Sequence, residues 1–545
     1  MHGSVGNADL GGGIIVSTRL STTEPFARNA TGLVREIGVW VAVALTFNQI
    51  VGGGIYAFSV QQSFQWPGSS PAGVLLLATI PVLLLALVYT WLATAMPRAG
   101  GDYVFLSRLV HPAVGWLLSW LMLSTRVFLV GTLMFADVQL WGASLSLVGL
   151  TLHATALEHF GSYLGTSLSA GIVGAIVLAL TVFAFLSLGG RAFSWYVAVL
   201  FVIPVLGGIA TIIVFLAHPY SAPSLRSVWN SIYGSGAYQE IVRVAHQTGW
   251  HATGVSFSRT LAAINVGIFA FAIAPWTSAT FGGEIKRPQR SFWIAIVGST
   301  ILAAIFMAIL AVGPTYSTGQ FVSMYNWVYY TPAAHKLMTI NPGFAPTITL
   351  FVLPFAHNPI LLILLAIGGA ISLYHVAPSA VLAGSRYILA MSFDRYFPEW
   401  LSGVSERFHT PIRAIGLLTV GGILGVFLNY VYGWTTGLSA FSSVVTLIWA
   451  GVSVAGFLFP WRMPDVYNTV RVQVLGVPLI QIVSALSFLL SAYLFVQVTV
   501  TATPASLWMT LITTLAGVIV YAYYYWRNAR LGVTPAMIYS ELPPE

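Results

Sequence analysis

Long apolar stretches, separated by short segments rich in polar residues, glycine or proline, run along most of the chain. About twelve of them reach roughly 20 residues, the length that a helix needs to cross the hydrocarbon core of a bilayer. The pattern predicts helices over 37–61, 71–96, 112–146, 167–188, 192–217, 259–283, 290–315, 357–393, 412–432, 435–460, 478–500 and 505–527. Uninterrupted apolar runs exclude the alternating strands of a membrane barrel. We therefore expect an all-α polytopic membrane protein with about 12 transmembrane helices, numbered here in chain order.

The composition also indicates a membrane protein. Of 545 residues, 57% are hydrophobic and only 7% are charged, against about 25% charged in soluble domains. The net charge of +8 comes from basic residues scattered singly between apolar runs, so nucleic acid is not an expected partner. The chain has no cysteine, and no phosphate-cradling loop, zinc-protease or hydrolase motif occurs. We expect neither an enzyme nor a cofactor or metal.

Basic residues predict the orientation. If the N-terminus is cytosolic, 17 of the 22 Lys and Arg residues fall on the cytosolic side and 4 outside, with Arg126 inside a helix. Because cytosolic loops carry the excess of Lys and Arg, we expect both termini in the cytosol and the protein in the cell membrane. The expected units are a tail over 1–36, five helices over 37–217, an extracellular loop over 218–258, five more helices over 259–460, and two peripheral helices with a cytosolic tail over 461–545. The polar connection over 316–356 is expected to hold a short surface helix over 331–341.

Two predicted helices are interrupted in mid-membrane. Helix 1 carries three consecutive glycines over 52–54, each of which costs about 1 kcal/mol in a helix, and helix 6 carries Pro275, which removes a backbone donor. An ordinary kink is the alternative for either helix. The interruptions fall in the first helix of each set of five, and an odd number of spans inverts the second set. The two breaks are therefore expected to meet near the midplane, as in inverted-repeat transporters.

Such a pair of breaks suits a zwitterion. N–H groups freed over 52–55 would bind a carboxylate at the positive end of a half-helix, and carbonyl groups freed over 272–274 would accept from an ammonium group. The predicted substrate-binding residues are Ile50, Val51, Gly52, Gly53, Gly54, Ile55, Phe269, Phe271, Ala272, Ala274 and Trp276.

Four segments, in order along the chain, carry a family resemblance. They are the glycine-rich stretch over 52–56, the segment over 97–103 followed by Gly115, Trp116 and Trp120, the acidic-then-basic stretch over 282–290, and the segment over 385–411. They resemble signatures of the amino acid–polyamine–organocation (APC) transporter superfamily, and within it the amino acid permeases. The resemblance implies a LeuT-like core of five plus five inverted helices over roughly 37–460. It also implies import of an amino acid or related amine by alternating access, often driven by protons or by exchange.

The chain departs from the family at two places. Some proton-coupled members carry a Lys on helix 5, whereas 191–217 contains none and a rough alignment puts Pro204 near that position. The stretch around Pro275 and Trp276 is also atypical. Sodium coupling within the same fold and a transporter-like amino acid sensor remain alternatives to a proton-coupled or exchanging permease. The protein is expected to be a monomer or a homodimer, with the lipid bilayer and an amino acid as partners, and H⁺ or a counter-amino acid as a possible third.

Several polar residues within the helices are candidates for coupling or gating. Arg126 and Asp137 lie on one face of helix 3 but about 16 Å apart, too far to pair, and an intramembrane charge is costly enough to mark function. His375 and Ser379 on helix 8 could titrate or bind an ion. Each also has a structural interpretation, as a hydrogen-bonded packing residue. Glu284, Lys286 and Arg386 are expected to form a cytoplasmic gate.

Overall fold

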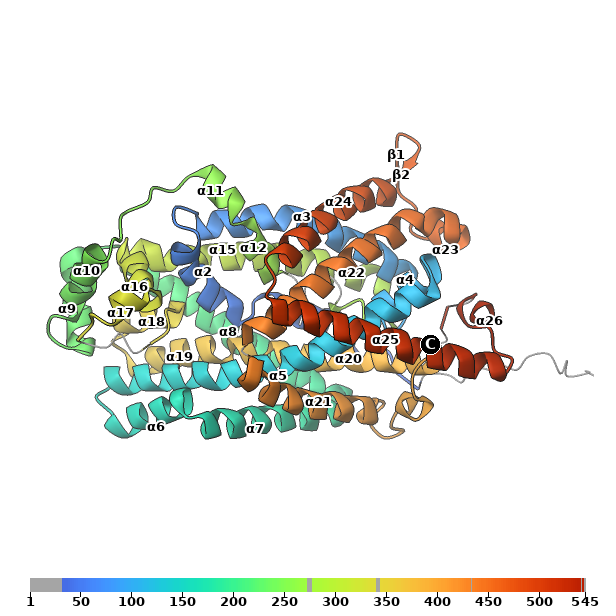
Figure 1. The fold of residues 1–545 in the computed structure, drawn as a ribbon, viewed down its shortest axis with the longest axis horizontal. Coiled ribbons are helices and arrows are strands. Elements are labelled where there is room, and N and C mark those ends of the chain that lie inside the picture. The colour runs from blue at the N-terminus through green and yellow to red at the C-terminus, as the bar shows by residue number, and fades with distance from the viewer. Residues whose placement is uncertain (1–31, 272–276, 340–343, 433, 541, 544–545) are drawn as a thin grey trace, which may run out of the picture.

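The computed structural model describes residues 32–271, 277–339, 344–432, 434–540 and 542–543. Long helices run side by side along the longest axis of the molecule (Figure 1). Within the described ranges, nine helices are long and apolar enough to cross a membrane: Pro71–Ala95, Pro112–Thr151, Leu168–Ser187, Gly190–Ala217, Pro288–Thr318, Pro359–Phe393, Ser439–Arg462, Leu479–Val500 and Pro504–Arg530. Two shorter apolar helices, Val39–Ile50 and Ile412–Leu428, accompany them. The chain is an all-α polytopic membrane protein.

The first part of the chain forms ten helices in the described residues. They are α1 (Val39–Ile50), α2 (Gly53–Gln65), α3 (Pro71–Ala95), α4 (Asp102–Leu109), α5 (Pro112–Thr151), α6 (Thr155–Thr166), α7 (Leu168–Ser187), α8 (Gly190–Ala217), α9 (Ala222–Tyr233) and α10 (Ala237–Gln247).

The second part contains further helices and one short hairpin. These are α11 (Phe257–Ala262), α12 (Ile264–Ala270), η1 (Gly282–Glu284), α14 (Pro288–Phe292), the π-helical turn η2 (Trp293–Gly298), α15 (Ser299–Thr318), α16 (Phe321–Tyr330), α17 (Pro332–His335), α18 (Ile348–Val352), η3 (Leu353–Phe355), α19 (Pro359–Tyr374), α20 (Val376–Phe393), η4 (Glu399–Ser402), α21 (Ile412–Tyr432), α22 (Trp434–Arg462), α23 (Pro464–Asn468), β1 (Gln473–Val474), β2 (Val477–Pro478), α24 (Leu479–Val500), α25 (Pro504–Arg530) and α26 (Pro535–Tyr539). The two strands pair antiparallel, with Gln473 opposite Pro478.

The apolar pattern locates the long helices well and the short ones poorly. Most predicted ends lie within a few residues of the observed ones, although α5 continues to Thr151 rather than ending near 146. The segment over 218–258, expected as a loop, contains α9 and α10, and the helices α4 and α6 were not predicted. Such helices, of 8–12 residues, are too short to register as membrane spans. Of the surface helix expected over 331–341, the described part holds α17, and the longer α16 precedes it.

Glycines allow some helix backbones to approach each other very closely. A Cβ atom at Gly131 of α5 would lie 2.4 Å from the Gly422 carbonyl oxygen of α21, and one at Gly142 would lie 2.3 Å from the Gly165 nitrogen of α6. Small residues are enriched where membrane helices pack, because they let backbones meet. These contacts fix α5, which carries Arg126 and Asp137, between α6 and α21.

Short elements cover the two ends of the bundle (Figure 1). At one end lie α9, α10 and α16, and at the other lie α4, α23 and α26. We call the second the Arg386 end. There, bridges join Ile37 to Ile285 and Ala99 to Phe281, so segments far apart in the sequence are held together by backbone hydrogen bonds.

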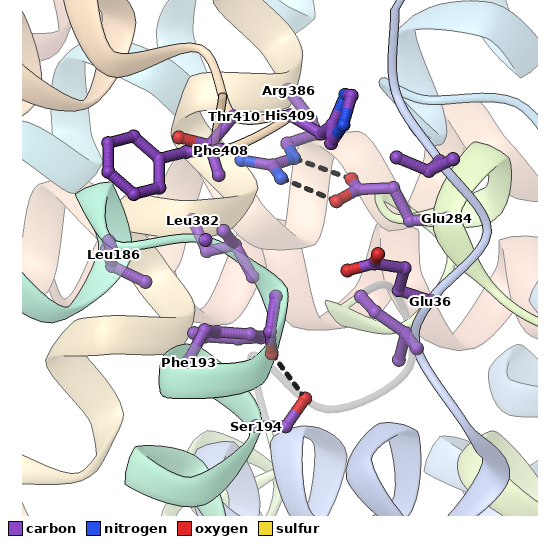
Figure 2. A pocket seen from close by; sticks show the side chains of 14 residues that line it. Glu36, Leu186, Phe193, Ser194, Glu284, Leu382, Arg386, Phe408, His409 and Thr410 are labelled. Carbon is purple, nitrogen blue, oxygen red and sulfur yellow. Dashed lines mark hydrogen bonds and ion pairs between the residues drawn. The ribbon is translucent and has the colours of Figure 1, made fainter. Parts of the chain in front are cut away.

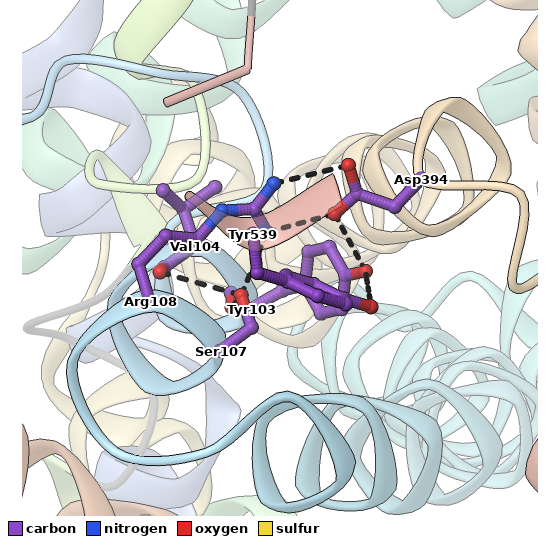
Figure 3. Close-up of polar contacts among 6 residues, drawn as sticks. All are labelled: Tyr103, Val104, Ser107, Arg108, Asp394 and Tyr539. Carbon is purple, nitrogen blue, oxygen red and sulfur yellow. Dashed lines mark hydrogen bonds and ion pairs between the residues drawn. The ribbon is translucent and has the colours of Figure 1, made fainter. Parts of the chain in front are cut away.

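A buried ion pair anchors the C-terminal segment at the Arg386 end (Figure 3). Arg108 of α4 contacts Asp394 at 2.7 Å, and both side chains are inaccessible to solvent. The Tyr103 hydroxyl donates to Asp394 at 2.8 Å and lies 3.0 Å from the Tyr539 hydroxyl. The centre of the Tyr539 ring lies 4.7 Å from the Arg108 guanidinium carbon. The helix α26 is therefore docked on a buried polar cluster.

Candidate functional site

The predicted interruption of helix 1 is present. The helix α1 ends at Ile50, Gly52 is extended with φ −84° and ψ 179°, and α2 begins at Gly53. A Cβ atom at Gly52 would lie 2.8 Å from a methyl group of Val376 on α20, so the break is packed against that helix. The first turn of a helix leaves N–H groups without intrahelical partners. The Ile55 N–H, one of the predicted carboxylate donors, instead donates to the Gly52 carbonyl oxygen at 3.1 Å. The start of α2 thus presents the backbone of Gly53 and Gly54 inside the bundle, between the buried Val51 and Ile55.

The helical run predicted over 259–283 is also discontinuous. Its described part holds α11, α12, which ends at Ala270 before the buried Phe271, and the first residues of η1. Pro275, at which the interruption was predicted, lies outside the described residues. The predicted site residues Ala272, Ala274 and Trp276, and the side chain of Phe269, lie outside the described residues. Beyond that gap, the Ser278 hydroxyl hydrogen-bonds to Thr46 of α1 and donates to the Ala42 carbonyl oxygen at 3.3 Å. The segment that follows residue 276 therefore contacts α1.

The single helix predicted over 357–393 consists of two helices, α19 and α20, which meet at His375. The His375 ring lies between two carbonyl oxygens: Nε2 is 2.7 Å from that of Val51, at the helix 1 break, and Nδ1 is 3.2 Å from that of Leu200 on α8. The Gln49 amide donates to the carbonyl oxygen of Val376. Ser379, one turn further along α20, is buried.

Arg126 and Asp137, the two charged residues within α5, contact α20 and α19 respectively, at separate levels. Asp137 accepts a hydrogen bond from the Tyr374 N–H at 3.0 Å. Arg126 donates to the carbonyl oxygen of Ala380 at 3.2 Å, and its guanidinium carbon lies 5.5 Å from the centre of the Tyr387 ring. Since Ala380 follows Val376 by one helical turn, Arg126 contacts α20 about 6 Å along the axis from the helix 1 break.

Asp102 completes this cluster, and the sequence pattern did not single it out. The Tyr387 hydroxyl donates to Asp102 at 2.7 Å, and Asp102 is only 1% exposed. Burial raises the pKa of Asp102 to about 6, while the hydrogen bond from Tyr387 and the charge of Arg126 act in the opposite direction. The sequence signal that could have identified Asp102 is its place as an acidic residue within the segment over 97–103. It lies at the start of α4, a short helix that the hydropathy pattern does not detect.

Two of the three predicted gate residues form an ion pair at the Arg386 end (Figure 2). The Arg386 guanidinium donates to both carboxylate oxygens of Glu284, at 2.7 and 2.6 Å. Arg386 is 1% exposed, whereas Lys286 is exposed and takes no part in this pair. Glu36, Ser194 and His409 line the same small cavity. A Cβ atom at Gly190 would overlap the Glu36 carboxylate, which therefore sits at the N-terminus of α8, where a negative charge is favourable.

A family model described as amino acid permease matches residues 37–521, nearly the whole described bundle. The chain belongs to the amino acid permease family. A branched-chain amino acid permease of Lactococcus lactis subsp. cremoris is 25% identical over 401 residues, which cover 72% of this chain and 75% of the relative. A serine/threonine exchanger of Bacillus subtilis is 23% identical over 389 residues, covering 70% and 74%. An uncharacterised transporter of Mycobacterium tuberculosis is 25% identical over 433 residues, covering 78% and 80%.

The membership confirms the resemblance that the sequence signatures indicated. Because its named relatives are permeases and transporters, the permease is a transporter of amino acids rather than an enzyme.

Replacing Asp102 with Asn is expected to change how the stability of the permease depends on pH. Because the folded-state pKa of Asp102 is raised from 3.8 to about 6, the folded protein holds a proton that the unfolded chain releases between these values. The resulting stabilisation is present below about pH 4 and is lost as the pH rises through 6. Asn resembles the protonated acid at every pH. From pH 4 to 7, the wild type should therefore lose on the order of 3 kcal/mol relative to Asp102→Asn.

Thermal unfolding of the detergent-solubilised protein at a series of pH values measures this difference. The matched control is Glu399→Gln, because Glu399 forms an exposed pair with Arg527. Its melting temperature should follow that of the wild type at each pH. Parallel curves for Asp102→Asn and the wild type would contradict the assignment.

Proposed function

We propose that the permease carries an amino acid across the membrane by alternating access and binds the substrate carboxylate at the helix 1 break. The observation that carries the proposal is the start of α2 in mid-bundle at Gly53, preceded by the extended Gly52. Backbone N–H groups at such a helix start favour an anionic group. An ammonium group would bind carbonyl oxygens near the end of α12, on the neighbouring interrupted helix. This arrangement suits the two charges of a zwitterion.

Apolar groups around the break support a substrate with a neutral side chain. Ile50, Val51 and Ile55 are all buried there, and they offer contact area without a counter-charge for a charged side chain. The relatives' names point the same way, because branched-chain amino acids, serine and threonine all have neutral side chains. We therefore infer a neutral amino acid as substrate, with leucine as the first to test.

The Arg386–Glu284 pair supports a gate on the cytosolic side. The excess of basic residues in the loops on the Arg386 side supports placing that side, with both termini, in the cytosol. In the conformation described, the pair and the backbone bridges around Ile37 and Ala99 close this end. Transport would then require these contacts to separate while the opposite end closes.

Uptake into liposomes tests the function directly. Purified permease in liposomes preloaded with unlabelled leucine should take up labelled leucine at least tenfold faster than protein-free liposomes. Leucinamide, which lacks the carboxylate, should compete at least tenfold less well than leucine, because the helix 1 break would lose its anionic partner. Absence of exchange for every neutral amino acid would overturn the proposal, and equal competition by leucinamide would overturn the placement of the carboxylate.

A further inference from the structure

His375 has an unusual hydrogen-bonding environment. Both of its ring nitrogens face backbone carbonyl oxygens, at 2.7 Å from Val51 and 3.2 Å from Leu200. The residue is 1% exposed. It connects three elements, namely the break between α1 and α2, the middle of α8, and the joint between α19 and α20.

A carbonyl oxygen accepts hydrogen bonds and cannot donate them. A neutral imidazole carries one N–H and one lone pair, whereas an imidazolium carries two N–H groups. A neutral ring between Val51 and Leu200 can therefore satisfy one carbonyl and must turn its lone pair towards the other. A protonated ring donates to both, and a buried cation needs such partners because removal from water is costly. The number of N–H groups on the ring therefore decides whether both contacts are hydrogen bonds.

Several other polar groups near the joint hydrogen-bond to groups other than the His375 ring. The Tyr374 N–H donates to Asp137, the hydroxyls of Tyr374 and Tyr196 hydrogen-bond to each other, and Gln49 donates to Val376. Among the described residues, no carboxylate hydrogen-bonds to the His375 ring. The two carbonyl oxygens are thus the groups that distinguish its two protonation states.

We propose that His375 carries the coupled proton of the permease, and that the imidazolium ties the helix 1 break to α8 in the conformation described. This inference rests on the proposed function. In the transport cycle, the neutral ring accepts a proton from water on one side of the membrane, and an N–H bond forms. It releases the same proton to water on the other side. Loss of the proton removes one of the two contacts, either that to Val51 or that to Leu200.

The position of Val51 links protonation of His375 to substrate binding. Val51 is the residue directly before Gly52 and the proposed carboxylate site, so a change in its carbonyl contact acts on the backbone that binds the substrate. Protonation would favour the arrangement in which the helix 1 break is held against α8 and α20.

Two assays on one variant separate coupling from structure. We expect His375→Gln to retain leucine exchange at equal pH to within threefold of the wild type. Its accumulation of leucine, driven by an inward proton gradient, should fall at least tenfold, to the level without a gradient. A merely structural role would reduce both activities together. The matched control is His218→Gln, since His218 lies just after α8 and contacts the Val214 carbonyl oxygen; it should keep both activities.

The outcomes distinguish the two proposals. Exchange without any proton-driven accumulation by the wild type overturns the role of His375 and leaves the proposed function intact, whereas absence of exchange overturns the function itself. Gradient-driven accumulation by His375→Gln also overturns the role. If that variant does not fold, His375→Lys supplies a fixed cation: exchange that no longer changes between pH 6 and 8 supports the proposal, and wild-type pH dependence contradicts it.

Discussion

Replacement of Arg126 by Met is expected to reduce amino acid uptake at least a hundredfold while leaving a folded protein. Met keeps the length and apolar character of the stem but removes the charge. The guanidinium donates to Ala380 and lies over the Tyr387 ring, one helical turn from the helix 1 break. Without it, the Asp102 carboxylate and the incoming substrate carboxylate lose the positive charge that offsets them in a buried site.

Arg126→Lys is the matched variant. It retains the charge but loses the planar fork, so we expect it to keep roughly a tenth of wild-type uptake. A purely structural role predicts instead that Arg126→Met transports normally once folded. Uptake into liposomes, normalised to protein that elutes as a single species in size-exclusion chromatography, decides between them.

The double variant Arg126→Met with Asp102→Asn isolates the contribution of charge. Removing both members of an attracting pair avoids leaving a buried charge uncompensated. The melting temperature lost in Arg126→Met should therefore largely return in the double variant, while uptake stays low. Recovery of uptake together with stability would show that Arg126 serves only to neutralise Asp102.

Replacement of Arg386 by Met is expected to open the Arg386 end of the bundle. The variant leaves the Glu284 carboxylate buried without its bidentate partner, which costs on the order of 3–5 kcal/mol in buried pairs. Separation of α20 from η1 would expose Glu284 to water and relieve this cost. Coupled transport should fall at least tenfold, because one gate no longer closes.

Because the chain has no cysteine, one introduced thiol reports this opening cleanly. Ser194 lines the cavity at the gate, and Ser194→Cys should react with a water-soluble maleimide at least tenfold faster in the Arg386→Met background. Ser63, half-buried near the end of α2 at the opposite end of the bundle, is the matched position. Ser63→Cys should react more slowly when the Arg386 end opens. Faster labelling at both positions would mean general loosening and would contradict a gate.

The sequence by itself determined the features that depend on neighbours along the chain. Apolar runs set the long helices because each needs about 20 residues to cross a bilayer. Of the three glycines over 52–54, Gly52 lies at the break between α1 and α2, and Gly53 begins α2; glycine weakens a helix locally. Four short signatures identified the amino acid permease family.

Tertiary structure decided which polar groups meet. Arg386 and Glu284 are 102 positions apart, Tyr387 and Asp102 are 285 apart, and His375 and Val51 are 324 apart. No local pattern encodes such pairings, since they follow from how helices pack in three dimensions. Hydropathy also marks α4 as a polar connection, because its eight residues are too few to span a bilayer. Packing buries Asp102 beside Tyr387, and only that packing gives the acid its altered pKa.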